Sequence, residues 1–213
     1  TKTDAEIIIN CIGLIPQKKP SNLDYRKVNI DLPVFLESLG KKIIHPSTDC
    51  EFTGSIPNNR KYSKNDTRDA TDVYGKSKAD ISTLIENSFV NTKIIRTSII
   101  GHEGLTHLSL LDWFLNSENE VNGYIDRYWN GITTLQWAKQ CEKVLNNWDV
   151  LPALNQYGTA DIASKYTLLT IIRDVYKKNI IIKEALSPKP ENKCLESDEV
   201  LPSIKTQLQE LQE

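Results

Sequence analysis

The first hundred residues alternate between short apolar runs and longer stretches with helical spacing. Residues 5–9, 42–46 and 92–100 are rich in β-branched side chains and predict strands, whereas 23–39 and 73–87 have the spacing of amphipathic helices. Strands that alternate with helices predict a parallel sheet with right-handed crossovers and helices on both faces. The first run is continuously apolar, so we expect a strand that is covered on both faces.

The helix expected over 23–39 carries its apolar residues on one broad face, which we expect to be buried. That face consists of Val28, Leu32, Phe35, Leu36 and Leu39. Gly40 follows and ends the helix. Residues 53–72 are rich in Asn, Asp, Ser and Gly and predict a long surface loop.

The second half of the chain has a less regular pattern. It predicts a short helix over 108–115, longer amphipathic helices over 134–148 and 163–178, a short strand over 180–182 and a closing helix over 204–211. No internal repeat or low-complexity linker interrupts it.

Charge and hydropathy exclude two classes of partner. The formal net charge is -2, and Lys and Arg occur in ones and twos without a basic stripe, so no nucleic-acid partner is expected. The longest apolar run, near 7–15, is broken by Asn10 and Gly13 and is too short to span a bilayer. The chain begins with polar residues and shows no signal peptide, so we expect a cytoplasmic protein without a membrane partner.

The sulfur-containing residues are unusual. The four cysteines, Cys11, Cys50, Cys141 and Cys194, form no CxxC pair and have no histidine at zinc spacing, so we expect free thiols and no metal site. Two disulfides in a secreted protein are the alternative. The chain contains no methionine at all, which indicates that these residues are not the whole gene product.

One motif carries chemistry. Tyr74 and Lys78 stand four residues apart in YGKSK, so a helix places them on one face about one turn apart. A free phenol titrates near ~10, and a nearby ammonium favours the phenolate and lowers that pKa. Tyr74 could then exchange a proton with a carbonyl or alcohol oxygen. The motif alone is weak, because many solvated helices contain it by chance.

The context strengthens this interpretation. The second strand ends in Ser47 and Thr48, and ligands of open α/β sheets bind at the carboxyl ends of strands. Cys11, Ile12 and Gly13 follow the first strand, where small residues allow close approach by a cofactor. The segments INCIG, YRKVNID, HPSTDCEFTG, YSKNDTRDATDVYGKSK and RTSIIGHE together resemble the extended short-chain dehydrogenase/reductases, in the branch of the dTDP-4-dehydrorhamnose reductases. The likeness covers most of 4–103, and WNGITTLQWAK and GTADIASKYTLLTIIRDVY extend it more loosely.

The resemblance implies four catalytic residues. Tyr74 would donate the proton to the keto oxygen of a sugar nucleotide, and Lys78 would hold the nicotinamide ribose and lower the pKa of Tyr74. Thr48 would hydrogen-bond the reacting oxygen. Asn29 matches an asparagine that supports the lysine through water in relatives.

The resemblance also implies binding residues. Cys11, Ile12 and Gly13 match the loop beside the adenosine and phosphates of NADPH or NADH, and the segment beside the nicotinamide is matched by Thr97, Ser98 and Ile99. The hydride would come from this cofactor. The residues expected to contact substrate, besides Thr48, are Asp49, Cys50, His102 and Trp129.

The implied architecture is a Rossmann-like α/β domain with a smaller substrate-binding lobe. We expect the cofactor domain in 1–103 and about 126–150, and the substrate lobe in about 104–125 and 151–213. The family's glycine-rich GxxGxxG turn is missing, so the chain is expected to begin at the fourth strand of such a sheet. A role in dTDP-rhamnose and polysaccharide biosynthesis and a homodimer are further expectations.

Three functions stay open. The first is reduction of a 4-keto-6-deoxy sugar nucleotide. The second is a bifunctional epimerase and reductase, for which Cys50, two residues after Thr48, and His107 occupy the required positions. The third is a non-catalytic NADP-binding regulatory subunit. A 4,6-dehydratase is disfavoured, because an acidic pair should follow the threonine and Asp49 is followed by Cys50. Cys11 and Cys50 are otherwise expected to be small buried residues.

Overall fold

The computed structural model describes residues 4–57, 60–104 and 108–213. It consists of two compact units, each formed from separate stretches of the chain. The first unit contains residues 1–53, 65–96 and 140–156, and the second contains 54–64, 97–139 and 157–213. Among the described residues, no helix has the length and apolar character that crossing a membrane would require.

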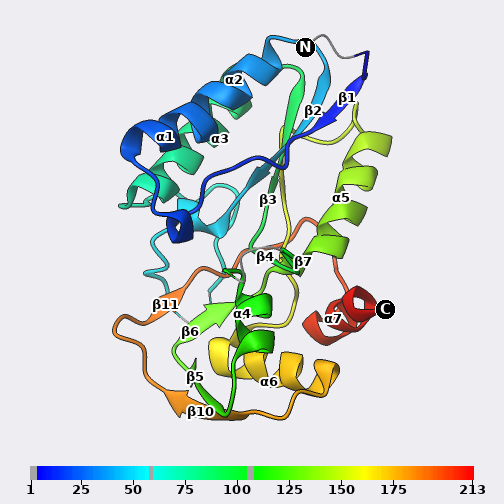
Figure 1. Cartoon of the computed structure of the whole chain (residues 1–213). Coiled ribbons are helices and arrows are strands. Elements are labelled where there is room, and N and C mark those ends of the chain that lie inside the picture. The colour runs from blue at the N-terminus through cyan, green and yellow to red at the C-terminus, as the bar shows by residue number, and fades with distance from the viewer. Residues whose placement is uncertain (1–3, 58–59, 105–107) are drawn as a thin grey trace. The chain divides into compact units, whose positions relative to one another are not determined.

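The first unit is built on a parallel sheet of four strands in the order β1-β2-β3-β8 (Figure 1). These strands are β1 (Ile7–Ile9), β2 (Lys42–Ser47), β3 (Thr92–Arg96) and β8 (Leu154–Gln156). The pairs Ile8 with Ile43 and His45 with Ile94 set the register of the first three strands. The predicted parallel sheet is therefore confirmed, and β8 is a fourth strand that the apolar pattern did not indicate.

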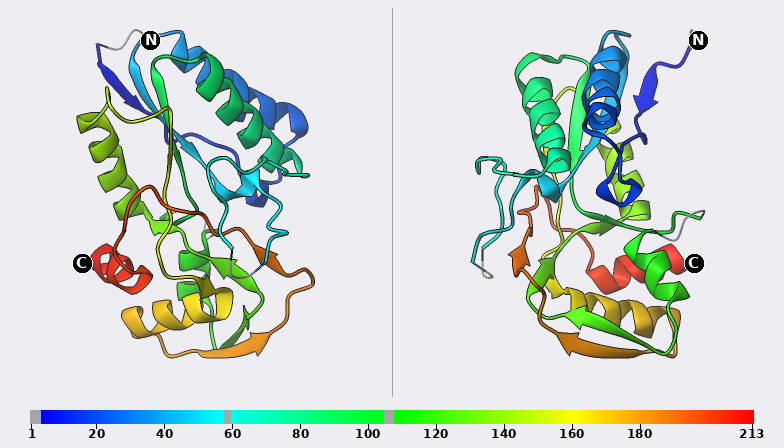
Figure 2. Two further views of the ribbon diagram at one scale, coloured as in Figure 1. Left: turned by 180° about the vertical axis from the view of Figure 1, so that it is seen from behind. Right: turned by 60° about the vertical axis from the view of Figure 1, so that its left-hand side comes forward.

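Helices lie on both faces of this sheet (Figures 1 and 2). One face carries α3 (Val73–Ser88) and the helical run before β2, and the other carries the half of α5 (Thr134–Asn146) that begins at Gln140. On the first face α3 packs through a core of Ile81, Ile85, Ile94 and Leu154. Long apolar side chains spaced about one turn apart on α3 explain why this helix lies along β3.

The helical run before β2 differs from its prediction. It consists of α1 (Asn22–Arg26), a π-helical turn η2 (Lys27–Asp31) and α2 (Leu32–Glu37). Its buried residues are Tyr25, Asn29 and Pro33, whereas Phe35 and Leu39 of the predicted apolar face are exposed. The wider π-helical turn changes the rotation of the helix, so a 3.6-residue period cannot identify the buried face across it.

Two strand predictions are also wrong in part. Ile7 and Ile9 of β1 are each 43% exposed, because β1 is the edge strand and its outer face is not covered by described residues. The predicted strand 92–100 stops at Arg96, and Ile99–Ile100 forms a separate strand, β4, that pairs with β7 (Ile132–Thr133). The chain passes from the first unit to the second at this break.

In the described part of the second unit, short strands and helices surround an apolar core. Strand β5 (Glu120–Tyr124) pairs in parallel with β10 (Ile181–Ala185), and β6 (Arg127–Trp129) lies between β9 (Ala163–Ser164) and β11 (Glu191–Asn192). The helices are α4 (Leu110–Asn116), α6 (Lys165–Tyr176) and α7 (Ile204–Gln212). Their buried side chains, among them Phe114, Leu168, Ile172 and Leu208, form the core.

The compact units differ in extent from the predicted domains. Residues 54–64, 97–103 and 126–139, expected in the cofactor domain, belong to the second unit, and 151–156, expected in the substrate lobe, belong to the first. Strand β8 explains the last difference, since it hydrogen-bonds to β3. The assignment of cofactor and substrate to separate parts of the chain stays a prediction.

Candidate active site

Thr48 begins the turn that follows β2. Its hydroxyl oxygen accepts a hydrogen bond from the Cys50 N–H (3.1 Å) and caps the 3-10 helix η3 (Asp49–Glu51). The hydroxyl donates to the Asp49 carboxylate (3.0 Å). These bonds hold Thr48 and Asp49 together at the carboxyl end of the strand, where the sequence predicted a ligand.

Tyr74 and Lys78 lie on the first turns of α3. Asp72 caps this helix by accepting from the Gly75 N–H (2.9 Å). A Cβ atom at Gly75 would lie 2.3 Å from the Cys50 carbonyl oxygen, so only glycine allows α3 to approach the turn after Thr48 this closely. The glycine of YGKSK therefore has a packing role that places Tyr74 beside that turn.

The pKa of Tyr74 is raised above its usual value, which corrects the predicted lowering. Burial of the half-buried phenol is the main cause, and the neighbouring Cys50 adds to it. A hydrogen bond between the Thr48 and Tyr74 side chains acts in the opposite direction but is weaker. Desolvation disfavours the phenolate more than the surroundings stabilise it, so Tyr74 is a protonated phenol at neutral pH.

Lys78 is buried, and its ammonium donates to the Pro46 carbonyl oxygen of β2 (2.8 Å). Burial lowers its pKa to about 8, and the negative charge of Glu51 opposes the lowering. His45 lies close by: burial and then the charge of Lys78 hold the pKa of His45 well below its usual value. Lys78 is thus poised to change charge just above neutral pH.

Asn29 connects helix α3 to the loop after β1. Its side-chain amide donates to the Ser77 hydroxyl (3.1 Å) and to the Leu14 carbonyl (3.2 Å), and its oxygen accepts from the Leu14 N–H (2.9 Å). Asn29 lies in the π-helical turn and is only 1% exposed. It therefore fixes the loop that contains Gly13 relative to α3.

The loop after β1 presents its side chains to solvent. Cys11 and Ile12 are exposed, which corrects the expectation that Cys11 is buried, and Cys50 is half-buried rather than buried. The Ile12 N–H donates a hydrogen bond to the side-chain oxygen of Asn10 (2.9 Å). All four cysteines are free thiols, as expected. The loop is therefore held near its start by Asn10 and near its end by Asn29.

Five further predicted site residues belong to the second unit. Thr97 is buried and Ile99 is half-exposed, while Ser98 accepts from the Trp129 indole N–H (2.8 Å). Trp129 itself is buried in the core of this unit. The fifth, His102, follows strand β4 and Gly101.

His102 has two partners within the second unit. One ring nitrogen contacts Asp112 (2.7 Å), and the other contacts the Tyr176 hydroxyl (3.1 Å). His107, which the epimerase hypothesis uses, lies outside the described residues.

A buried ionic network beneath the site was not predicted. Glu51 and Arg96 are both fully buried and paired at 2.6 Å, and Arg68 binds the same carboxylate oxygen at 2.6 Å. A charged residue at the end of an apolar strand, as Arg96 is, was a signal that a buried partner existed. The partner, Glu51, could not be identified because it is 45 residues away.

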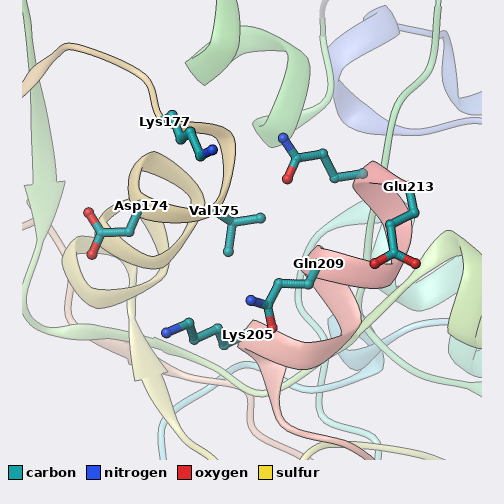
Figure 3. Close-up of a pocket in the computed structure, with 7 residues that line it drawn as sticks. Asp174, Val175, Lys177, Lys205, Gln209 and Glu213 are labelled. Atoms are coloured by element: carbon teal, nitrogen blue, oxygen red, sulfur yellow. The ribbon is translucent and has the colours of Figure 1, made fainter.

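A pocket lies in the second unit, beside α6 and α7 (Figure 3). It is lined by Asp174, Val175, Lys177, Lys205, Gln209, Gln212 and Glu213, so charges of both signs surround it. None of the predicted site residues lines it. Within the described part of the chain, no group of three or more His, Cys, Asp or Glu side chains could hold a metal ion.

The first unit has a parallel sheet covered by helices, with a Tyr and a Lys one turn apart beside a strand-end threonine. These features define a Rossmann-like fold of the short-chain dehydrogenase/reductase type. The family model of the RmlD substrate binding domain matches residues 33–192, and the chain belongs to this family. The predicted fold class and relationship are confirmed, and the family is one of NAD(P)-dependent oxidoreductases.

Solved structures agree with this fold. The dTDP-4-dehydrorhamnose reductase of Clostridium acetobutylicum has a TM-score of 0.82 at 18% identity over 97% of this chain and 79% of that one. The Bacillus anthracis reductase, in complex with NADP, has a TM-score of 0.81 at 16% identity over 97% and 79%. The dTDP-glucose 4,6-dehydratase of Bacillus anthracis, in complex with NAD, has a TM-score of 0.76 at 14% identity over 98% and 71%. No curated protein matches the chain by sequence.

Proposed function

We propose that the protein reduces the keto group of a 4-keto-6-deoxy sugar nucleotide with NADPH or NADH, as a dTDP-4-dehydrorhamnose reductase does. The observation that supports this most is the grouping of the Tyr74 phenol, the Thr48 hydroxyl and the Lys78 ammonium at the carboxyl end of β2. An acid, a hydrogen-bonding hydroxyl and a cation are the groups that reduction of a ketone needs from a protein.

The residues of the first unit fit a nicotinamide cofactor. Lys78 has three donors, of which Pro46 accepts one, so its ammonium can also bind ribose hydroxyls. Cys11, Ile12 and Gly13 form the open loop that would face the adenosine and phosphates. Contacts of Thr97, Ser98 and Ile99 of the second unit with the nicotinamide are a separate part of the proposal. The bound cofactor supplies the hydride, which no side chain can provide.

The chain's own residues control the proton. Tyr74, whose raised pKa keeps it protonated, gives its proton to the ketone oxygen as that oxygen becomes an alcohol. Thr48 holds the oxygen in place by a hydrogen bond. The ammonium of Lys78, which is charged below a pH of about 8, is the cation beside the proposed cofactor ribose. Contacts of Asp49, Cys50, His102 and Trp129 with the sugar nucleotide are further parts of the proposal.

The substitution Tyr74→Phe tests this assignment. It removes the proton donor and keeps the ring, so kcat should fall by about 10²–10⁴-fold while the affinity for NADPH changes little. The measurement is oxidation of NADPH in the presence of the 4-keto-6-deoxy sugar nucleotide, with cofactor affinity determined by titration. Tyr25→Phe is the matched control, because its ring centroid lies 6.2 Å from that of Tyr74 outside the proposed chemistry. Unchanged turnover in Tyr74→Phe would overturn the proposal, and cofactor binding without any turnover by the native protein would favour a regulatory subunit.

The position of Cys50 favours a second candidate, the bifunctional epimerase and reductase. The Cys50 backbone packs against Gly75, the residue after Tyr74, and Cys50 contributes to the raised pKa of Tyr74. Epimerisation requires proton exchange at a carbon next to the ketone, which a thiol can perform and a serine hydroxyl cannot. We expect no Cys50-dependent exchange. Solvent deuterium that enters the keto sugar without reduced cofactor, and no longer does so in Cys50→Ser, would establish the epimerase instead.

A further inference from the structure

Glu51 is a fully buried carboxylate directly after the turn that carries Thr48. It is the last residue of η3, and its backbone carbonyl accepts from the Ala70 N–H (3.2 Å). A buried carboxylate is costly unless charges and hydrogen bonds compensate it. The hydrogen bonds and ion pairs of the Glu51 carboxylate therefore indicate its role.

The two oxygens of Glu51 bind four separate segments of the first unit. One oxygen accepts from the hydroxyls of Ser47, at the end of β2, and Ser82, on α3 (2.6 Å to Ser82). The other accepts from Arg68, in the loop before α3 (2.6 Å), and from Arg96, at the end of β3 (2.6 Å). One side chain thereby joins the strand that precedes Thr48 to the helix that carries Tyr74 and Lys78.

Arg96 makes this connection rigid. Besides Glu51, its guanidinium binds the Gln156 side chain of β8 (3.0 Å) and lies over the Phe52 ring (5.3 Å to the centroid). Arg68 reaches in the opposite direction, to Glu86 and to the Thr83 hydroxyl (3.1 Å) on the outer part of α3. The network therefore has two halves that meet at Glu51. The inner half runs through Arg96 to β8, and the outer half runs through Arg68 to Glu86.

Ser82 connects the network to the proposed active site. It lies one helical turn after Lys78, on the same face of α3, so the Glu51 carboxylate is held close to the ammonium of Lys78. The electrostatic effect on Lys78 supports this, since Glu51 counteracts the lowering of its pKa by burial. His45 also lies near Lys78, and its lowered pKa leaves it neutral, so it adds no positive charge there. The negative charge that acts on Lys78 is that of Glu51.

We propose that Glu51 is a positioning residue of the active site, which fixes the Thr48 turn against the catalytic helix and keeps Lys78 charged. This inference rests on the proposed function and extends it to a residue that touches neither cofactor nor substrate. Glu51 acts through Ser47 and Ser82 on geometry and through space on Lys78. Arg68 and Arg96 both pair with its carboxylate inside the unit.

The test compares Glu51→Gln with Glu51→Asp and Glu86→Gln. Glu51→Gln removes the charge at nearly constant shape, Glu51→Asp keeps the charge but shortens the side chain, and Glu86→Gln breaks only the outer half of the network. The readouts are the pH dependence of turnover and the pKa of Lys78, followed by NMR of its side-chain carbon in lysine-labelled protein and assigned with Lys78→Arg.

In Glu51→Gln we expect the alkaline limb of activity and the Lys78 titration to move together to lower pH, by about half a unit or more. We expect kcat to fall by about tenfold or more, because the turn and the helix lose their connection. In Glu51→Asp and Glu86→Gln, the pKa of Lys78 should be the same as in the native protein. A merely structural Glu51 would lower the melting temperature without moving the titration, and that result, with kcat within twofold of native, would overturn the proposal.

If Glu51→Gln does not fold, the double substitution Glu51→Gln/Arg96→Gln replaces it, because Arg96 is then not left charged and unpaired and Arg68 keeps its pair with Glu86. The same downward shift of the Lys78 titration is expected, and a native titration would count against the proposal. A native protein that reduces no keto sugar would refute the proposed function alone. The NMR titration of Lys78 needs no substrate and would still decide the role of Glu51.

Discussion

Lys78 is the side chain whose charge state sets the upper pH limit of the proposed reaction. Its pKa is about 8, so its ammonium is largely present at pH 7 and is lost as the pH rises through that value. The phenol of Tyr74 does not limit the reaction in this range, since burial raises its pKa above the usual value. The pH profile of the protein should therefore report on Lys78.

We predict that kcat/KM for NADPH falls on the alkaline side with a midpoint near the Lys78 pKa of about 8. Lys78→Ala should weaken both cofactor binding and turnover, because the ammonium serves both. Steady-state kinetics across the pH range provides the measurement. Lys76→Ala is the control, since Lys76 is exposed on the same helix. A native profile that stays flat well above pH 8 would show that the ammonium is not required.

Gly75 determines how closely helix α3 approaches the turn after Thr48. An alanine Cβ would lie 2.3 Å from the Cys50 carbonyl oxygen and 2.6 Å from the Ala70 Cβ. Gly75→Ala should therefore lower the free energy of unfolding by about 1–3 kcal/mol, despite the better helix propensity of alanine. Urea unfolding measures this, with Asp80→Ala at an exposed position of α3 as control. Turnover should fall as well, because Tyr74 adjoins the displaced residue, and a stabilised, fully active variant would contradict this geometry.

At the scale of elements, Glu37 joins the end of α2 to the start of β3. One of its oxygens accepts from the Val90 N–H (2.9 Å) and the Asn91 N–H (3.0 Å), and the other accepts from the Thr92 hydroxyl (2.6 Å). Burial would raise the pKa of Glu37, but these bonds together outweigh it and hold the pKa below its usual value. The carboxylate thus fixes the turn that leads into the central strand.

The Glu37 contact predicts a pH-dependent stability. Because the pKa is lower in the folded protein, the stabilisation is complete above the unfolded value of 4.5 and is lost as the pH falls through the folded value. Glu37→Gln should destabilise the protein by about 1–3 kcal/mol at neutral pH. The difference in melting temperature from the native protein should shrink in acid, and an equal difference at every pH would rule out the ionised contact.

At the scale of the whole molecule, the two compact units have separate apolar cores. The first contains Ile94 among its buried residues, the second contains Ile172, and the two clusters share no residue. A packing defect in one core should therefore change the free energy of unfolding by the same amount whether or not the other core is also altered.

We predict that Ile94→Val and Ile172→Val each lower the free energy of unfolding by about 0.5–1.5 kcal/mol. In the double variant the effects should add to within about 0.5 kcal/mol. Denaturant unfolding of the two single variants and the double variant measures this. A clear departure from the sum would indicate that the cores are energetically coupled.

Local periodicity was sufficient for most of the elements. The parallel strand pattern, helix α3 and helices α5, α6 and α7 all lie within a few residues of their predicted bounds, because each is long or strongly patterned. Strands β5, β6, β7, β8, β9 and β11 were missed, since each is short and shows no clear alternation. The buried face of the run before β2 was missed because of the π-helical turn.

The sequence by itself determined the features that depend on near neighbours: the helix that carries Tyr74 and Lys78, the strand end at Thr48, and the family to which these motifs are related. Tertiary structure decided what surrounds those groups. It raised the pKa of Tyr74 through burial, exposed Ile7 and Ile9 at a sheet edge, and paired Glu51 with Arg96 across 45 residues. Helical spacing is a local property of the backbone, whereas desolvation and ion pairing depend on which distant segments the fold brings together.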